Sequence, residues 1–188
     1  MVATSTAGTQ PIRSGLRRAN PRRDLSAIAD LIEVCFADTL DAGGRSMLRE
    51  MRLIASSGPL TWILARAARA IPAMDGFVWV EDDRVVGNVS LTAAGYDRGQ
   101  VVANVAVSPE YRGRGIARRL MTAAMERISN HARFAVLQVD AGNTAARHLY
   151  ESLGFQTQRT FTRWRRASNY RTPLLMPDPQ LVRALRHR

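Results

Sequence analysis

Residues 105–117 are the most informative part of the chain, and they read Val105-Ala106-Val107-Ser108-Pro109-Glu110-Tyr111-Arg112-Gly113-Arg114-Gly115-Ile116-Ala117. An apolar run typical of a strand is followed by a short turn and then by a glycine-rich entry into an amphipathic helix. Gly113 and Gly115 leave no side chain where backbone N–H groups could face an anion, and the helix N-terminus adds about half a positive charge. The stretch therefore predicts a phosphate site, although glycines before a helix also serve plain tight turns.

Downstream of this stretch, helical and extended patterns alternate. Over residues 114–130 apolar side chains recur at four-residue intervals, which predicts a helix with a broad apolar face. Residues 134–139 predict a strand, residues 144–153 a helix closed by Gly154, and residues 155 to about 166 another strand. With the strand that precedes the glycines, this order predicts a mixed α/β unit.

Upstream, the chain has a short extended pattern followed by helical patterns. Residues 14–19 predict a short strand, and a helix with Asp24 as its N-cap follows as far as Phe36. Residues 38–44 predict a turn, after which apolar spacing indicates a second helix that ends near Ser57. A third helix is predicted from Pro59 to about Ala70.

The spacing of apolar residues then changes from one typical of helices to one typical of strands. Residues 77–80 and 85–91 predict two strands joined by the tight acidic turn Glu81-Asp82-Asp83-Arg84. A second turn at residues 96–99 leads into the apolar run of residues 101–107, which is typical of a central strand. The sequence thus predicts helices followed by a hairpin and then the alternating segment.

Two motifs resemble those of the GNAT superfamily of acetyltransferases. Residues 112–117 match the family signature Arg/Gln-x-x-Gly-x-Gly/Ala, and residues 106–111 resemble the strand and turn that precede it. Further along, Asn143-x-x-Ala146-x-x-Leu149-Tyr150-x-x-x-Gly154-Phe155 resembles the family's second motif. The glycine spacing of the dinucleotide fingerprint and the lysine of the Walker loop are absent. The resemblance covers residues 77–164.

The resemblance implies an α/β fold with a mixed α+β sheet, the acyl-CoA N-acyltransferase fold, in which the fourth and fifth strands splay apart and coenzyme A enters the gap. Residues 1–12 lack periodicity and are expected to form a flexible tail, so the acetyltransferase domain is assigned to residues 13–170 and a C-terminal extension to residues 171–188. Acetyl-CoA is then the cosubstrate, without a metal. The residues implied to bind it are Val105, Ala106, Val107, Arg112, Gly113, Arg114, Gly115, Ile116, Ala117, Arg118, Asn143, Ala146 and Tyr150.

The resemblance also implies roles in acetyl transfer. Attack by a neutral amine on a thioester expels a thiolate, and a phenol with a pKa near 10 can donate a proton to it, which makes Tyr150 the implied catalytic acid. By helical position alone, a tyrosine is equally typical of a packed residue. The backbone N–H of Val105 is the implied oxyanion donor. Asn143 begins a helix, so an N-cap role stands beside its implied hydrogen bond to the cofactor.

The chain departs from the family pattern at the general base. Many relatives carry a glutamate or histidine on the fourth strand, whereas residues 101–104 here are Val-Val-Ala-Asn. No side chain among these four takes a proton. The remaining carboxylates expected near the acceptor are more typical of surface charge, and they are Glu33, Asp38, Asp41, Asp97 and Asp140.

Whether a base is needed depends on the acceptor, which the sequence predicts to be a small-molecule or peptide amine. A lysine amine is neutral in only about one molecule in two thousand at pH 7, whereas an α-amine with a pKa near 8 is neutral in roughly one in ten. A weakly basic amine can therefore react with water as the only base, which favours an α-amine or an aromatic amine.

Composition sets wider bounds. Basic side chains number 27 against 16 acidic ones, a formal net charge of +11, and every one of them is arginine. Arginine suits phosphates, yet a solvated basic surface explains the same excess. Cys35 is alone, so no intramolecular disulfide forms, and no metal-ligand spacing occurs. Without a signal-peptide pattern or a spanning run, we expect a cytoplasmic protein with no membrane partner. A homodimer is left open.

Two other function classes stay open at this stage. Residues 159–166 alternate arginine with Phe161 and Trp164, a composition that suits nucleic-acid or ribosome binding. An edge strand with its arginines outward explains the same pattern, so nucleic acid is the less favoured partner. The other class is an acyl-CoA-binding pseudoenzyme that acts as a sensor.

Overall fold

The computed structural model describes residues 14–58, 75–95 and 98–162. Its elements are, in chain order, β1 (Gly15–Arg18), α1 (Pro21–Cys35), α2 (Ala42–Ser56), β2 (Asp75–Glu81), β3 (Arg84–Ala93), β4 (Gly99–Val107), the 3-10 turn η1 (Pro109–Tyr111), α4 (Ile116–Ser129), β5 (Phe134–Leu137) and α5 (Thr144–Ser152). The chain divides into two compact units at Gly154 and Phe155, and all of these elements lie in the first.

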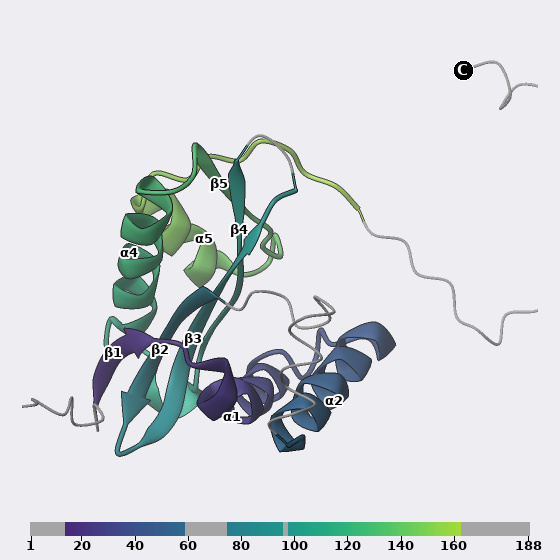
Figure 1. Cartoon of the computed structure of the whole chain (residues 1–188). Helices are drawn as coiled ribbons and strands as arrows, with labels where there is room; N and C mark the ends of the chain where they lie inside the picture. The colour runs from purple at the N-terminus through teal and green to yellow at the C-terminus, as the bar shows by residue number, and fades with distance from the viewer. Residues whose placement is uncertain (1–13, 59–74, 96–97, 163–188) are drawn as a thin grey trace, which may run out of the picture. The chain divides into compact units, whose positions relative to one another are not determined.

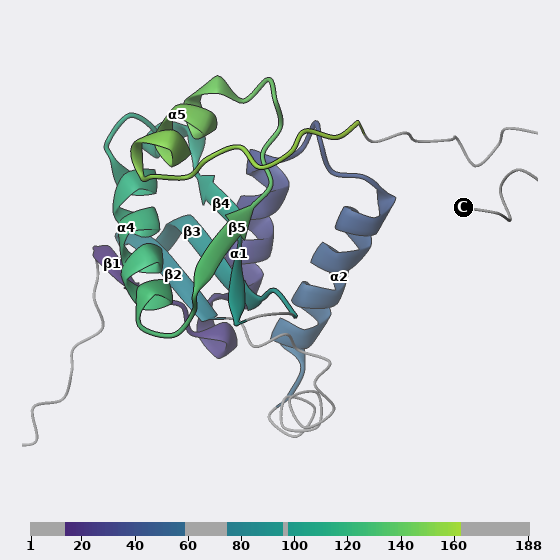
Figure 2. The same cartoon turned by 90° about the horizontal axis from the view of Figure 1, so that it is seen from above.

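The strands form one mixed sheet in the order β1-β2-β3-β4-β5 (Figure 1). The pairs β1–β2, β2–β3 and β3–β4 are antiparallel, and β4–β5 is parallel. Helix α1 packs on one face with α2 against it, while α4 packs on the other, as the view from above shows (Figure 2). This arrangement confirms the predicted mixed α/β fold.

The hairpin between β2 and β3 turns at Asp82 and Asp83. Both residues adopt the left-handed backbone conformation, with φ angles of 46° and 61°. A two-residue loop with two positive φ angles has the twist that two right-twisted strands need, and aspartate tolerates this conformation better than most residues. The predicted acidic turn is confirmed.

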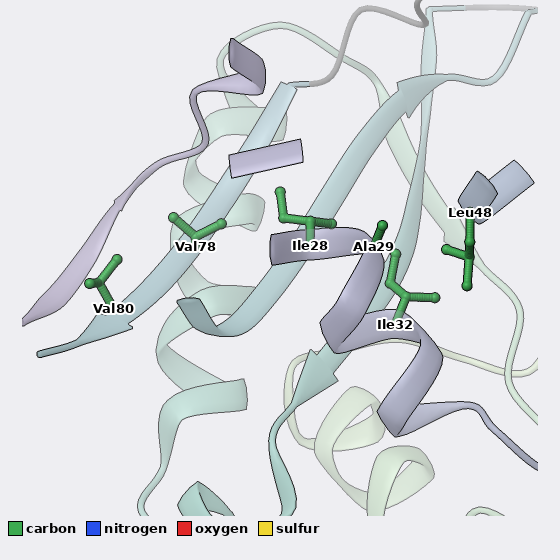
Figure 3. Close-up of a cluster of buried hydrophobic side chains, with 6 residues drawn as sticks. All are labelled: Ile28, Ala29, Ile32, Leu48, Val78 and Val80. Atoms are coloured by element: carbon green, nitrogen blue, oxygen red, sulfur yellow. The ribbon is translucent and has the colours of Figure 1, made fainter. Parts of the chain in front are cut away.

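Alternate residues of β2 face the α1 side. Val78 and Val80 are fully buried there, against three residues of α1 and one of α2 (Figure 3). Each fully buried aliphatic side chain contributes about 1.5–3 kcal/mol relative to exposure. The cluster joins both N-terminal helices to the sheet, and its members are Ile28, Ala29, Ile32, Leu48, Val78 and Val80.

Helix α4 packs on the opposite face of the sheet. A Cβ atom at Gly87 of β3 would lie 3.0 Å from both Ile116 Cγ2 and Leu120 Cδ1, so the missing side chain lets the first turns of α4 approach the sheet closely. The guanidinium group of Arg119 lies 5.4 Å from the ring centroid of Trp79 on β2. These contacts hold the N-terminal half of α4 over β2 and β3.

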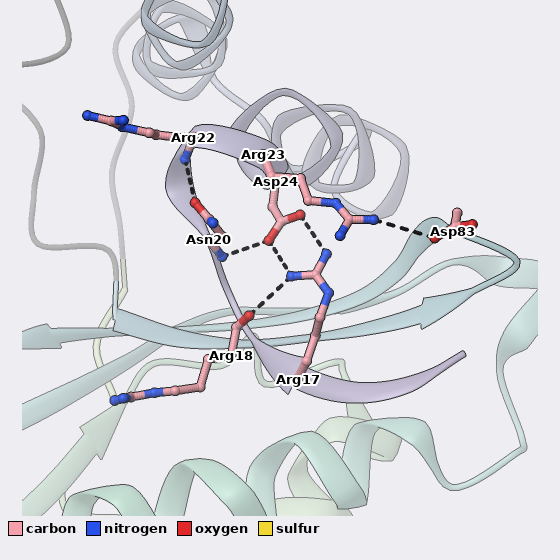
Figure 4. Close-up of polar contacts among 7 residues, drawn as sticks. All are labelled: Arg17, Arg18, Asn20, Arg22, Arg23, Asp24 and Asp83. Atoms are coloured by element: carbon pink, nitrogen blue, oxygen red, sulfur yellow. Dashed lines mark hydrogen bonds and ion pairs between the residues drawn. The ribbon is translucent and has the colours of Figure 1, made fainter. Parts of the chain in front are cut away.

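Asp24 is not the N-cap of the first helix, contrary to the prediction. The helix begins one turn earlier, at Pro21, and the side chain of Asn20 caps it by accepting the N–H of Arg22 at 3.1 Å. Asp24 is instead buried, with 1% of its surface exposed. Its carboxylate oxygens accept hydrogen bonds from both terminal nitrogens of Arg17 and from the Asn20 N–H, at 2.7 Å each (Figure 4). The prediction failed because the partner arginine comes from β1.

Two other predictions need correction. The turn expected over residues 38–44 is shorter, because Asp41 caps α2 by accepting the Gly44 N–H at 2.8 Å and both glycines enter the first helical turn. The strand expected from residue 155 is wrong over residues 155–162, which have no regular secondary structure. Alternating side chains form a strand only where a partner strand accepts the backbone hydrogen bonds.

Some predictions lie outside the described residues: the tail over residues 1–12, the third helix from Pro59, most of the C-terminal segment and part of the turn at residues 96–99. Among the helices that the structure describes, none combines the length and hydropathy that crossing a bilayer requires.

Candidate functional site

The sheet opens between β4 and β5. Parallel pairing runs from Gly99 opposite Phe134 only as far as Val102 opposite Leu137, although β4 continues to Val107. On its other edge β4 stays paired with β3, where Asn88 lies opposite Ala106. Among the described strands, the last part of β4 thus has a partner on one side only, which is the parting of the fourth and fifth strands that the family resemblance implies.

A β-bulge lies where the strands part. Ser90 pairs with Ala103 and Asn88 with Ala106, so two residues of β4 stand against one residue of β3. The first of the two, Asn104, has a φ of 51°, a left-handed value that asparagine tolerates. The second is Val105, the expected oxyanion donor.

The glycine-rich loop leads from this strand into α4. Gly113 and Gly115 both have left-handed φ angles, 77° and 74°, and a Cβ atom at either would meet nothing within 4 Å. Their glycine identity therefore serves the backbone conformation and keeps the space beside it open. Gly115 is the N-cap of α4 and has no side chain to bond the first N–H groups of the helix. The loop can accept an anion.

The arginines of the loop are exposed and bonded to protein groups. Arg112 Nε donates to the carbonyl of Val107 at 3.1 Å. Arg114 Nη2 donates to the Glu110 carbonyl at 3.3 Å, and its guanidinium group lies 4.9 Å from the ring centroid of Tyr111. Arg118 Nη2 donates to Ser152 Oγ of α5 at 2.9 Å, which ties α5 to α4. Each uses one of its five guanidinium N–H donors in these bonds, so other donors of the same side chain stay available to a phosphate.

Helix α5 carries the second motif. Asn143 is its N-cap, with Oδ1 accepting the Ala146 N–H at 3.1 Å, so the predicted capping role is confirmed. Gly154 just beyond the helix has a φ of 86°, as expected of a terminating glycine. The side-chain amide of Asn143 is exposed and remains available to a ligand.

Tyr150 lies near the end of α5 with 8% of its surface exposed. Burial raises the pKa of its phenol above the ordinary value of 10. The phenol is therefore protonated throughout the neutral range, the state that a proton donor requires.

Three of the carboxylates considered as bases have structural partners. Glu33 pairs with Arg52, Asp41 caps α2, and Asp140 accepts the Gly142 N–H at 2.7 Å. Asp97 lies outside the described residues. Asp38, in the turn after α1, is exposed, and the described part of the chain offers its carboxylate no hydrogen bond or ion pair.

Sequence reasoning missed two residues of other elements, Cys35 of α1 and Asn88 of β3, that bond to the last part of β4. Cys35 Sγ, at the end of α1, donates to the Val107 carbonyl at 3.3 Å. Burial raises the pKa of this thiol, and Arg112 opposes the shift. Asn88 is 1% exposed, and its amide donates a hydrogen bond to the carbonyl of Asn104 in the bulge. An asparagine inside the apolar run of residues 85–91 was the available signal.

No group of three or more His, Cys, Asp or Glu side chains with metal-binding geometry occurs among the described residues. A mixed sheet that opens beside a glycine-rich helix N-terminus defines the acyl-CoA N-acyltransferase fold class. The chain belongs to the acetyltransferase (GNAT) family, whose profile matches residues 45–155. The resemblance stated from the two motifs is confirmed.

Known proteins of this class are similar to the chain. It is 36% identical over 88 residues to N-alpha-acetyltransferase 30 of Schizosaccharomyces pombe, across 42% of the chain and 55% of that protein. It is 34% identical over 154 residues to mycothiol acetyltransferase of Thermobispora bispora, across 79% of the chain and 46% of that protein. The chain thus spans about half the length of these curated relatives.

The fold also matches a solved structure, that of a GNAT family acetyltransferase from Brucella melitensis in complex with acetyl-CoA. The TM-score is 0.53 and the identity 21%, with 76% of this chain and 82% of the other covered. At this identity the match supports the fold alone.

Proposed function

We propose that this chain transfers an acetyl group from acetyl-CoA to an amine by direct attack in a ternary complex. The observation that carries the proposal is the opening of the sheet after Val102, next to the glycine-rich N-terminus of α4, in a chain of the GNAT family. An extended thiol arm with a pyrophosphate at one end suits such an opening, because the strand offers backbone groups and the helix N-terminus offers N–H groups.

In this proposal the cosubstrate lies along the end of β4. Backbone groups of Val105, Ala106 and Val107 pair with the pantetheine arm, although the Val107 carbonyl already accepts two donors and contributes only by exchanging one. N–H groups from Arg112 to Ala117 hold the pyrophosphate. Arg112, Arg114 and Arg118 then turn toward the phosphates, while Asn143 and Ala146 contact the cosubstrate from α5.

The proposed reaction moves protons at the amine nitrogen and at the sulfur. The amine nitrogen donates its lone pair to the thioester carbon, and the Val105 N–H stabilises the oxyanion that forms. When the carbon–sulfur bond breaks, the sulfur takes the electron pair and receives the Tyr150 proton, and the Tyr150 phenolate then regains a proton from solvent. We assign the proton lost by the amine nitrogen to water, since residues 101–104 contain no base and three of the five candidate carboxylates have structural partners; among the described residues Asp38 is the alternative base.

An α-amine is the acceptor class that fits this site best. Water suffices as the base only for an amine with an appreciable neutral fraction at pH 7, and an α-amine is neutral in roughly one molecule in ten. The name of the S. pombe relative, N-alpha-acetyltransferase, supports the same class. Peptides with a free N-terminus are therefore the first acceptors to test.

The test is release of free thiol from acetyl-CoA in the presence of peptides whose only amine is either an α-amine or a lysine side chain. We expect thiol release with the α-amine peptides and little with the lysine peptides at pH 7. Binding of acetyl-CoA, seen as a rise in melting temperature, without turnover on any amine would favour the sensor. Tight RNA binding at physiological salt in place of acetyl-CoA binding would favour the nucleic-acid function.

A further inference from the structure

The amide of Asn88 holds the β-bulge of β4 from the neighbouring strand. Asn88 Nδ2 donates to the carbonyl of Asn104 at 2.9 Å and to Ser90 Oγ at 3.1 Å. The Asn104 carbonyl can only accept, so the amide nitrogen rather than the oxygen must face it. The orientation of the Asn88 side chain is therefore determined by the bulge itself.

The carbonyl that Asn88 holds shares a peptide plane with the N–H of Val105. No cis peptide bond occurs in the described chain. In a planar trans peptide the C=O and the N–H point in opposite directions. Because the Asn104 oxygen accepts from the Asn88 side-chain amide, the Val105 N–H points away from that amide, at a position where β5 no longer pairs with β4.

We infer that Asn88 is a positioning residue for acetyl transfer, which aims the Val105 N–H into the opening between β4 and β5. This inference rests on the proposed function, in which that N–H stabilises the oxyanion. Asn88 does not touch the reacting atoms. It acts through the Asn104–Val105 peptide, whose rotation it restrains.

The energetics of Asn88 support a functional role over a purely structural one. The side chain is 1% exposed, and its Oδ1 has no hydrogen-bond partner among the described residues. Such an orphaned acceptor costs free energy that a buried apolar side chain at the same position would not. Neighbouring positions in the strand are occupied by Val86 and Val89. The presence of asparagine between these valines is explained by its bond to the Asn104–Val105 peptide, which it orients.

The experiment compares Asn88→Val with Ser90→Ala. Valine is similar in volume and suits a strand, and it removes both the donor and the orphaned oxygen. Ser90→Ala removes the other partner of the Asn88 amide and leaves the bond to Asn104, so it serves as the matched control. Asn88→Ala is a second test variant should valine disturb packing.

Three readouts separate positioning from folding. In the protein without ligand, the Val105 amide resonance moves in Asn88→Val and stays in place in Ser90→Ala. With acetyl-CoA labelled at the carbonyl carbon, the infrared carbonyl band of the bound thioester shifts back toward its free frequency in Asn88→Val. Single-turnover acetyl transfer falls about tenfold to a hundredfold, below the loss of a whole oxyanion donor, while acetyl-CoA affinity and melting temperature change little.

The outcomes distinguish this inference from the proposed function. If wild-type protein binds and transfers acetyl groups while Asn88→Val and Asn88→Ala keep the same carbonyl band and transfer rate, the inference is wrong and the function stands. If wild-type protein does not bind acetyl-CoA, both fail. Equal losses in Ser90→Ala and Asn88→Val would also overturn the inference, because the bond to Asn104 would then have no special effect.

Discussion

Replacing Gly115 by leucine should abolish tight binding of acetyl-CoA while the protein stays folded. Gly115 has a φ of 74°, and a Cβ atom there meets nothing within 4 Å. The variant therefore adds left-handed strain but no overlap within the protein. That strain costs about 1–2 kcal/mol, equivalent to a fall in melting temperature of about 2–8 °C for a chain of this size.

The effect on binding should be larger than the effect on stability. The leucine side chain would occupy the open space beside the first N–H groups of α4, where we place the pyrophosphate. A hydrogen bond from an N–H to a charged group contributes about 1.5–3 kcal/mol, so losing one lowers the affinity about 10- to 150-fold. Loss of more than one would exceed that range.

The matched control is Gly95→Leu. Gly95 has a φ of 79° and equally open surroundings, but it lies in the loop between β3 and β4, beyond the opposite end of β4 from the glycine-rich loop. Both variants should lose similar stability in thermal melting, and only Gly115→Leu should lose affinity in titration calorimetry. Equal affinities in the two folded variants would refute the phosphate site at α4.

Four further predictions concern Tyr150, Asp38 and Asp24. Tyr150→Phe should slow single-turnover transfer roughly tenfold to a thousandfold with acetyl-CoA affinity unchanged, and a folded variant with the wild-type rate would remove Tyr150 from the mechanism. Because burial raises the pKa of Tyr150 in the folded protein, its contribution to the free energy of unfolding is complete below about pH 10 and is lost as the pH rises through the folded pKa. Wild-type protein should therefore lose stability more steeply than Tyr150→Phe in alkaline denaturant titrations, and parallel curves would contradict this. Asp38→Asn should transfer acetyl groups to an α-amine peptide within about threefold of the wild-type rate, since water is the proposed base, and a loss of tenfold or more would assign that role to Asp38. Asp24→Ala should lower the free energy of unfolding by about 3–5 kcal/mol, because it leaves the Arg17 guanidinium, 14% exposed, without its partner, and a loss below 1 kcal/mol in urea would show that the pair is weak.

Local sequence patterns predicted much of the fold and of the candidate site. The hairpin turn at Asp82 and Asp83, the helix after Gly115 and the N-cap at Asn143 depend on residues within a few positions of one another. Backbone propensity and capping act over that range, so a short window of sequence contains the information. The binding and catalytic roles assigned to residues in these elements remain predictions.

The failures occurred where the partner is distant in sequence or absent. Asp24 has the residue type and position of an N-cap, but the arginine of β1 makes it the centre of a buried ion pair. Residues 155–162 alternate as a strand would, yet alternation describes only side chains, and the hydrogen bonds of a strand depend on another segment.

The sequence alone determined most element types among the described residues, the glycine-rich loop before α4, the family and the absence of a base at residues 101–104, because each depends on residue identities or on short spacings. Only the tertiary structure decided which groups meet at the end of β4. The Asn88 amide reaches a carbonyl 16 residues away, and the Cys35 thiol reaches one 72 residues away. Such contacts result from how the sheet register and the helices pack, and no local pattern encodes them. The contact that restrains the Asn104–Val105 peptide is therefore a property of the folded sheet.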